Sequence, residues 1–103
     1  MFVVLLQFPV DSEEKKTKLD NLLDSPDGLA FTKKQKGFIS VEYGWADDKK
    51  GYKTWWGWEK WDSKEDYETY LQGRKADNVF ADKFFSITPD GPKPHEIGGI
   101  DLQ

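Results

Sequence analysis

The sequence predicts a single α+β domain with elements in the order β-α-β-β-α-β. Three observations lead to this prediction: an apolar β-forming run at residues 2–8, two adjacent aromatic strands at residues 38–45 and 52–61, and helical segments before and after that pair. The chain has 103 residues, enough for one modest hydrophobic core. We therefore treat residues 1–103 as one folding unit.

The first strand is the run FVVLLQF at residues 2–8, whose nearly continuous apolar character is typical of a strand covered on both faces. Asp11 or Ser12 then caps a helix. The apolar face of that helix carries Leu19, Leu22 and Leu23. Residues 25–28 have the composition of a helix break, and a short helical segment is expected at 29–31.

The two aromatic strands, 38–45 and 52–61, form a predicted hairpin joined by a polar turn at 47–51. Asp62 or Ser63 begins the next helix, because each stands three residues before an acidic residue, which is the spacing of a capping box. One face of this helix carries Tyr67, Tyr70, Leu71 and Arg74.

The last part of the chain supplies a further helical stretch with Val79, Phe80, Phe84 and Phe85, a loop at 89–94 and a final strand at 95–102. The complete order is the split βαβ arrangement of ferredoxin-like folds. We therefore expect a four-stranded antiparallel sheet with the helices on one face. The terminal segment 89–103 either joins its own sheet or exchanges with a partner subunit.

The strand at 52–61 carries indoles on both faces. Because side chains alternate, Trp56 and Trp58 share one face while Trp55 and Trp61 share the other. The helices can cover one face, so we expect a homodimer in which a second copy covers the other. Two interpretations of Trp56 and Trp58 stay open: packing alone, or the wall of a pocket in which an indole stacks on a planar ligand.

Composition argues against several classes of function, beginning with nucleic-acid binding. The net charge is −4 with a pI near 4.9, and the lysines are interleaved with acids, which disfavours nucleic-acid binding. The absence of Cys and the single His leave few metal ligands and no thiol nucleophile. The apolar start lacks the basic residues of a signal peptide and is interrupted by Gln7 and Pro9. We expect a cytoplasmic protein that binds neither nucleic acid nor membrane.

Two motifs carry a family resemblance. The sequence QKGFIS at residues 35–40, followed by EKWDSKEDY at residues 59–67, resembles the antibiotic biosynthesis monooxygenase family of dimeric α+β barrels. The similarity extends over residues 1–86, and its motifs are signatures of the fold more than of catalysis. The resemblance implies a homodimer with a cavity in each subunit between sheet and helices. In some members it implies oxygenation of an aromatic polyketide without metal or flavin, so no cofactor is expected.

Other members of that family degrade haem with an Asn, a Trp and a His. Gln7, Tyr70 and Phe80 stand near those three positions in this sequence, so the proximal haem ligand is missing. Haem degradation is therefore not expected.

The candidate catalytic residues are Arg74, Tyr70 and Gln7. Arg74 either lays its stem on the core with its guanidinium in water, or pairs with a carboxylate or phenolate of a ligand. Tyr70 either donates a hydrogen bond into a pocket or completes the core. Gln7 needs partners within a buried strand, which are either a neighbouring side chain or a substrate oxygen. The candidate ligand-binding residues are Trp56, Trp58, Tyr67, Phe80 and Phe84.

Three further residues can titrate in a useful range. Glu42 and Glu59 lie in adjacent predicted strands, and either is a general base if burial raises its pKa; otherwise both are solvated or salt-bridged. His95 is either a surface residue or a proton carrier. The leading hypothesis is a cofactor-independent monooxygenase-like protein that acts on or binds a hydrophobic small molecule. The alternatives are a non-catalytic binding or sensing protein on the same fold, and a purely structural module.

Overall fold

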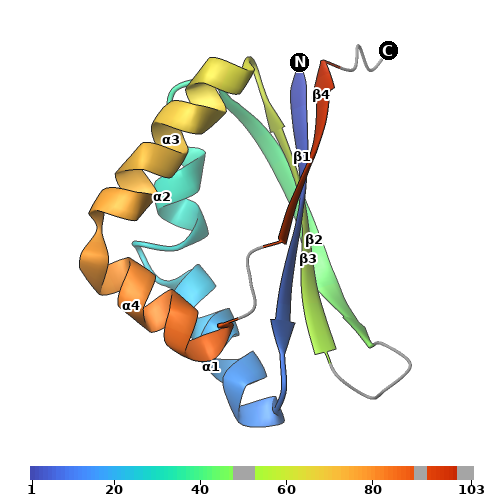
Figure 1. Ribbon diagram of the computed structural model, residues 1–103, viewed down its shortest axis with the longest axis vertical. Helices are drawn as coiled ribbons and strands as arrows, with labels where there is room; N and C mark the ends of the chain where they lie inside the picture. The colour runs from blue at the N-terminus through green and yellow to red at the C-terminus, as the bar shows by residue number, and fades with distance from the viewer. Residues whose placement is uncertain (48–52, 90–92, 100–103) are drawn as a thin grey trace.

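The computed structural model describes residues 1–47 and 53–89, and the backbone of residues 93–99. Its elements are β1 (Phe2–Val10), α1 (Glu13–Asp24), α2 (Leu29–Lys33), β2 (Phe38–Asp47), β3 (Lys53–Trp61), α3 (Lys64–Ala76), α4 (Asn78–Ile87) and β4 (Lys93–Gly99). The strand order is β2-β3-β1-β4, and each neighbouring pair is antiparallel. All the helices lie on one side of this sheet (Figure 1). The predicted ferredoxin-like α+β arrangement is confirmed.

The element bounds differ slightly from those expected. β1 continues to Val10, two residues beyond the apolar run, because Pro9 and Val10 still align with Thr54 and Lys53 of β3. β4 begins at Lys93, within the expected loop, and pairs with β1 of its own chain. Tyr52 and residues 100–102, for which the sequence predicts strands, lie outside the described residues.

Side-chain hydroxyls begin the two main helices. Of the two candidates before α1, Ser12 is the N-cap, and its Oγ accepts a hydrogen bond from the Lys15 amide at 3.1 Å. Ser63 has the same role before α3, where it accepts from the Asp66 amide at 3.1 Å. Asp77 ends α3 and caps α4, so the chain turns there without a loop. Of the two candidates predicted for each helix start, the serine is the N-cap in both helices.

The two motifs that carry the family resemblance meet in space. Gly37, in the first motif, has a φ of +83°, and a Cβ at this position would overlap the carboxylate of Asp66 in the second. The Asp62 amide donates a hydrogen bond to the Gly37 carbonyl at 2.7 Å. These contacts fix the start of β2 against the start of α3, which is why the motifs are signatures of the fold.

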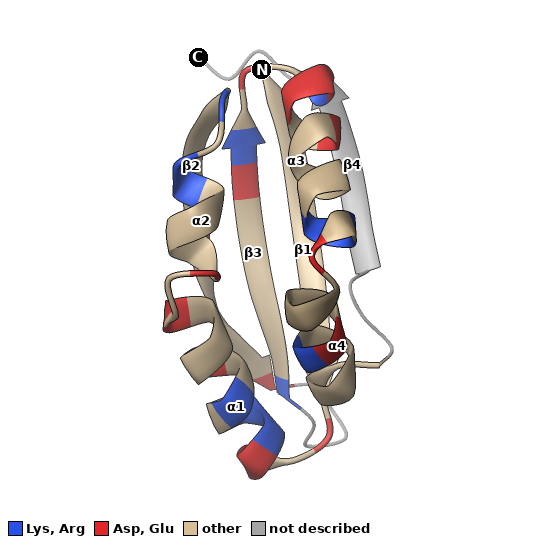
Figure 2. Ribbon diagram, turned by 90° about the vertical axis from the view of Figure 1, so that its left-hand side faces the viewer, with Lys and Arg blue, Asp and Glu red and all other residues tan. Residues whose placement is uncertain are grey.

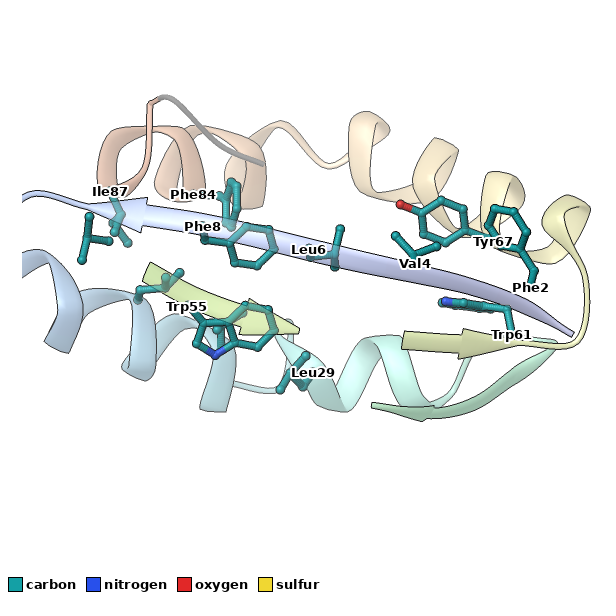
Figure 3. Close-up of a cluster of buried hydrophobic side chains, with 13 residues drawn as sticks. Phe2, Val4, Leu6, Phe8, Leu29, Trp55, Trp61, Tyr67, Phe84 and Ile87 are labelled. Atoms are coloured by element: carbon teal, nitrogen blue, oxygen red, sulfur yellow. The ribbon is translucent and has the colours of Figure 1, made fainter. Parts of the chain in front are cut away.

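The core lies between the sheet and the helices (Figure 3). Alternate residues of β1 and β3 supply one wall, and the four helices α1 to α4 supply the other. On β3 the indole of Trp55 is 1% exposed and stacks on Phe8, with ring centroids 4.8 Å apart and planes 6° apart. A Cβ on Gly57 would lie 2.5 Å from Cζ3 of Trp55. Gly57 therefore allows the indole to lie flat against the strand.

In the part of the chain that the structure describes, no helix covers the opposite face of the sheet, whose central side chains are half-buried. Its central positions include Leu5 and Gln7 of β1, which align with Trp58 and Trp56 of β3. Helices cover the other face in two columns, α1–α2 and α3–α4, on either side of β3 (Figure 2). Among the described residues, no helix combines the length and apolar character that a membrane span requires.

Candidate functional site

A cavity of about 330 Å³ lies between the sheet and the two columns of helices. Its volume is at the lower end of the range of small-molecule sites, about 300–1,000 Å³. Most of its wall is apolar and aromatic. The lining residues are Leu6, Phe8, Leu23, Leu29, Thr32, Trp55, Glu59, Tyr67, Tyr70, Leu71, Arg74, Lys75, Phe80, Ala81, Phe84 and Phe85.

Helical spacing brings most of the predicted site residues to this cavity. Tyr67, Tyr70 and Arg74 reach it from α3, and Phe80 and Phe84 reach it from α4. Phe84 also packs edge-to-face on Phe8 of β1, with ring centroids 4.8 Å apart. The structure therefore places two predicted catalytic residues and three predicted ligand-binding residues together.

Gln7, Trp56 and Trp58 are not brought to the cavity. The buried positions of β3 are Trp55, Gly57, Glu59 and Trp61, and Trp56 and Trp58 alternate with them on the helix-free face. Gln7 aligns with Trp56 on that same face. The expectation that Trp56 and Trp58 form the wall of this cavity is corrected, because the indole that contacts it on β3 is that of Trp55.

Arg74 connects α3 to the turn before α2. Its Nη1 donates to the carbonyl of Asp27, and its Nη2 donates to the carbonyl of Gly28 at 2.8 Å and to Thr32 Oγ1 at 2.9 Å. Its Nε donates to the Tyr70 hydroxyl at 2.8 Å. The guanidinium thus donates hydrogen bonds to groups of its own chain. The interpretation in which it lies free in water does not describe this structure.

Aromatic rings surround this guanidinium. Its carbon lies 4.2 Å from the ring centroid of Phe80 and 4.6 Å from that of Phe31. Such contacts contribute about 0.5–1 kcal/mol at exposed sites and more where water is excluded. The charge of Arg74 is therefore stabilised in an apolar setting without a carboxylate partner among the described ion pairs.

The Tyr70 and Thr32 hydroxyls complete this polar cluster. Their oxygens are 2.8 Å apart, and both accept hydrogen bonds from Arg74. Burial raises the pKa of the Tyr70 phenol, and the positive charge of Arg74 partly offsets that effect. Tyr70 is therefore a neutral hydrogen-bonding group at the cavity wall near neutral pH.

Glu59 is the acidic residue of the cavity wall. It is 2% exposed, and Trp61 Nε1 donates a hydrogen bond to its Oε1 at 3.2 Å. Burial raises the pKa of the Glu59 carboxyl above its ordinary value of 4.5, while the Trp61 hydrogen bond and the charge of Arg74 act in the opposite direction. Glu42, the other candidate acid, is exposed on β2. Of the two glutamates that the sequence offers as general bases, only Glu59 is therefore buried at the cavity.

Several residues of the cavity wall were not among the predicted site residues. Thr32 and Trp55 line the cavity and were not predicted to do so. Tyr43 stacks on Trp55 with ring centroids 5.6 Å apart, but its own side chain is 53% exposed. The side chain of His95 lies outside the described residues.

Solved structures of other proteins match the fold of this chain, whereas sequence comparisons find no match. No protein-family model matches the sequence, and no curated protein sequence matches it. A monooxygenase of Streptomyces coelicolor, from the gene ActVA-Orf6 and in complex with the ligand nanaomycin D, matches with a TM-score of 0.72 at 18% identity, over 99% of this chain and 89% of that one.

Two candidate antibiotic biosynthesis monooxygenases have similar structures. The protein from Bacillus cereus matches with a TM-score of 0.58 at 13% identity, over 99% of this chain and 93% of that one. The protein from Chloroflexus aurantiacus J-10-fl matches with a TM-score of 0.58 at 17% identity, over 99% of this chain and 95% of that one. The chain therefore has the fold of antibiotic biosynthesis monooxygenases, as its two motifs predicted.

Proposed function

We propose that this protein is a cofactor-independent monooxygenase that acts on a hydrophobic aromatic small molecule bound between the sheet and the helices. The observation that carries the proposal is the cavity of about 330 Å³, in which aromatic walls surround a few polar groups. Sites of this kind bind ligands through apolar contact and orient them with a small number of polar contacts. The shared fold with a monooxygenase that binds nanaomycin D is a second support.

The walls favour a flat ligand. Trp55 and Phe8 are held nearly parallel, and Phe84 meets Phe8 edge-on. Rigid rings of this kind give offset stacking and edge contacts to another aromatic system, each worth about 0.5–1.5 kcal/mol beyond burial. A cavity of this volume has room for about two or three fused rings. The proposed substrate is accordingly a small polycyclic phenol.

The proposed reaction uses dioxygen as the oxidant and the phenol as its own source of electrons. Loss of the phenolic proton gives an anion that transfers one electron to dioxygen, and the resulting superoxide and phenoxyl radical join in a carbon–oxygen bond. Cleavage of the O–O bond, together with loss of the hydrogen on the oxygenated carbon, leaves one oxygen atom on the ring as a quinone carbonyl. The other oxygen atom leaves as water, whose two protons come from the phenol and from that carbon. The protein contributes binding, orientation and control of the proton.

Oxygen consumption tests this function. We expect the protein to accelerate oxygen uptake with hydroxylated naphthalenes and anthracenes, and the quinone product to gain one atom of isotopic label from labelled dioxygen. The variant Ala81→Trp, which fills the cavity, is expected to abolish the acceleration. No uptake above the uncatalysed rate across such a panel would exclude the proposed reaction.

A non-catalytic binding protein is the second candidate. The observation that favours it is that the side chains of Arg74, Tyr70 and Thr32 form hydrogen bonds with one another. Arg74 also donates a hydrogen bond to the Gly28 carbonyl. Such a cluster holds the helices in place around a ligand without taking part in chemistry. Saturable binding of the same phenols without oxygen uptake would favour this function.

We further propose a homodimer formed by the helix-free face of the sheet. Trp56 and Trp58 are half-buried there beside Leu5 and Gln7, and a second copy would remove their indoles from water. Light scattering is expected to give twice the mass of the 12.0 kDa chain. The double variant Trp56→Lys, Trp58→Lys is expected to give the mass of one chain, and a monomeric wild-type protein at micromolar concentration would contradict the proposal.

A further inference from the structure

The carboxyl of Glu59 is buried in the wall of an otherwise mostly apolar cavity. The residue is 2% exposed, and it projects from the centre of the sheet, where its neighbours in register are Val4 of β1 and Val41 of β2. An ionised carboxylate in such a place is strongly disfavoured unless it is paired. A buried acid that lines a cavity is a candidate for chemistry.

Among the residues whose side chains are described, no group that faces Glu59 forms an ion pair with it. Arg74 of α3 directs its donors to Tyr70, Thr32 and backbone carbonyls, and none of the ion pairs among the described residues includes Glu59. The other titratable groups on the cavity wall are Tyr67 and Tyr70 of α3 and the exposed Lys75. Trp61 Nε1 supplies a hydrogen bond to one oxygen of the carboxyl.

We propose that Glu59 is the proton acceptor for a bound, uncharged phenol, and that it makes the site selective for neutral hydroxylated aromatics over aromatic carboxylates. This inference rests on the ligand class of the proposed function. The proton moves from the phenolic oxygen to the Glu59 carboxylate, leaving a phenolate and a neutral carboxylic acid. The same proton is returned to the oxygen atom that leaves as water, so Glu59 is regenerated.

The raised pKa of Glu59 supports both parts of the proposal. A carboxylate whose pKa is raised by burial is a stronger base than an exposed one, and general bases work best when their pKa lies near the working pH. Proton transfer to a positioned base contributes about 10²–10⁴-fold to rate. A ligand carboxylate would add a second negative charge to the same desolvated space, which one of the two acids could relieve only by taking up a proton.

Binding of two matched ligands tests the selectivity without reference to oxygenation. The probes are 2-naphthol and 2-naphthoate, which share one ring system and differ in charge at pH 8. Wild-type protein is expected to bind 2-naphthol at least about tenfold more tightly than 2-naphthoate, because repulsion between two buried carboxylates is worth at least about one pKa unit. Glu59→Gln, which keeps the size and an oxygen to accept from Trp61, is expected to reduce this ratio to about threefold or less.

Oxygen uptake tests the role of Glu59 in proton transfer. Glu59→Gln is expected to lower kcat about 10²-fold or more while leaving 2-naphthol affinity within about threefold, and to remove the rise of kcat/KM with pH that the wild-type carboxyl produces. Glu42→Gln, an exposed acid on β2, is the matched control and is expected to behave as wild type.

The two roles proposed for Glu59, proton transfer and ligand selectivity, can fail independently. An unchanged pH profile and rate in Glu59→Gln would overturn the proton-transfer role, and an equal preference for the two ligands in wild type and Glu59→Gln would overturn the selectivity. If wild-type protein consumes no oxygen, the proposed function fails and the proton-transfer role fails with it. The ligand pair then still decides whether Glu59 sets the charge of what binds.

Discussion

The hydrogen bonds of Arg74 predict a large loss of stability in the variant Arg74→Met, which keeps an apolar stem and removes the guanidinium. Three of the bonds, to Tyr70, Gly28 and Thr32, are partly buried, while the fourth, to Asp27, is exposed and can be replaced by water. Hydrogen bonds to charged groups contribute about 1.5–3 kcal/mol each. Tyr70 and Thr32 would still bond to each other, which offsets part of their loss.

With about 1.5 kcal/mol for the bond to the Gly28 carbonyl, and about half of that for each of the bonds to Tyr70 and Thr32, the free energy of unfolding is expected to fall by about 3 kcal/mol. For a chain of this size that corresponds to a decrease in Tm of about 12–24 °C. Urea unfolding followed by tryptophan fluorescence measures the change, and an unaltered slope with denaturant confirms that only stability has changed. Lys75→Met, at the neighbouring exposed position, is the control and is expected to remain within about 0.5 kcal/mol of wild type. A similar small effect for Arg74→Met would refute the assignment of these hydrogen bonds.

Three further predictions concern packing, a buried hydroxyl and pH. Gly57→Ala is expected to destabilise the protein by about 1–3 kcal/mol and to weaken phenol binding, because the new methyl group displaces Trp55; an unchanged melting temperature would contradict this contact. Thr88→Val is expected to cost about 1–3 kcal/mol in urea unfolding, since the Thr88 hydroxyl donates to the Pro9 carbonyl at 2.7 Å, and a neutral effect would show that the bond adds nothing. Glu59→Gln is expected to raise Tm at pH 8 and to leave it nearly unchanged at pH 4; a difference that does not vary with pH would be inconsistent with burial of an ionisable group.

The sign of the pH prediction follows from the direction of the pKa shift. Because the folded protein binds the Glu59 proton more tightly than the unfolded chain does, wild-type stability falls as pH rises from the ordinary value of 4.5 through the raised pKa of the folded state. A glutamine at this position carries no such proton. The advantage of Glu59→Gln therefore grows over that interval and then levels off. Greater stability with lower activity is a common property of variants at functional sites.

Local patterns predicted those parts of the site that lie on helices. The spacing of Tyr67, Tyr70 and Arg74 places them on one face of α3 whatever the rest of the chain does. The starts of α1 and α3 were limited to two candidates each by capping chemistry, and Ser12 and Ser63 satisfy it. These features depend on residues a few positions apart, which a single sequence displays directly.

The parts that were not predicted depend on long-range contacts. Alternation divides the indoles of β3 into two faces, but it does not say which face the helices cover. Gly57 was a usable signal, since a glycine beside Trp55 on one face gives that indole room to lie flat. Thr32 meets Arg74 across 42 positions of the chain, and no local pattern in α2 indicates that contact.

Calorimetric titration of the protein with 2-naphthol tests most directly the claim that the cavity binds a neutral aromatic molecule. We expect saturable binding of one ligand per chain with a negative change in heat capacity, as burial of apolar surface requires. Ala81 lines the cavity, so Ala81→Trp is expected to weaken this binding at least about tenfold by filling the space. Equal affinity in the two proteins, or no saturable binding to the wild type, would show that this cavity is not a binding site for neutral aromatic molecules.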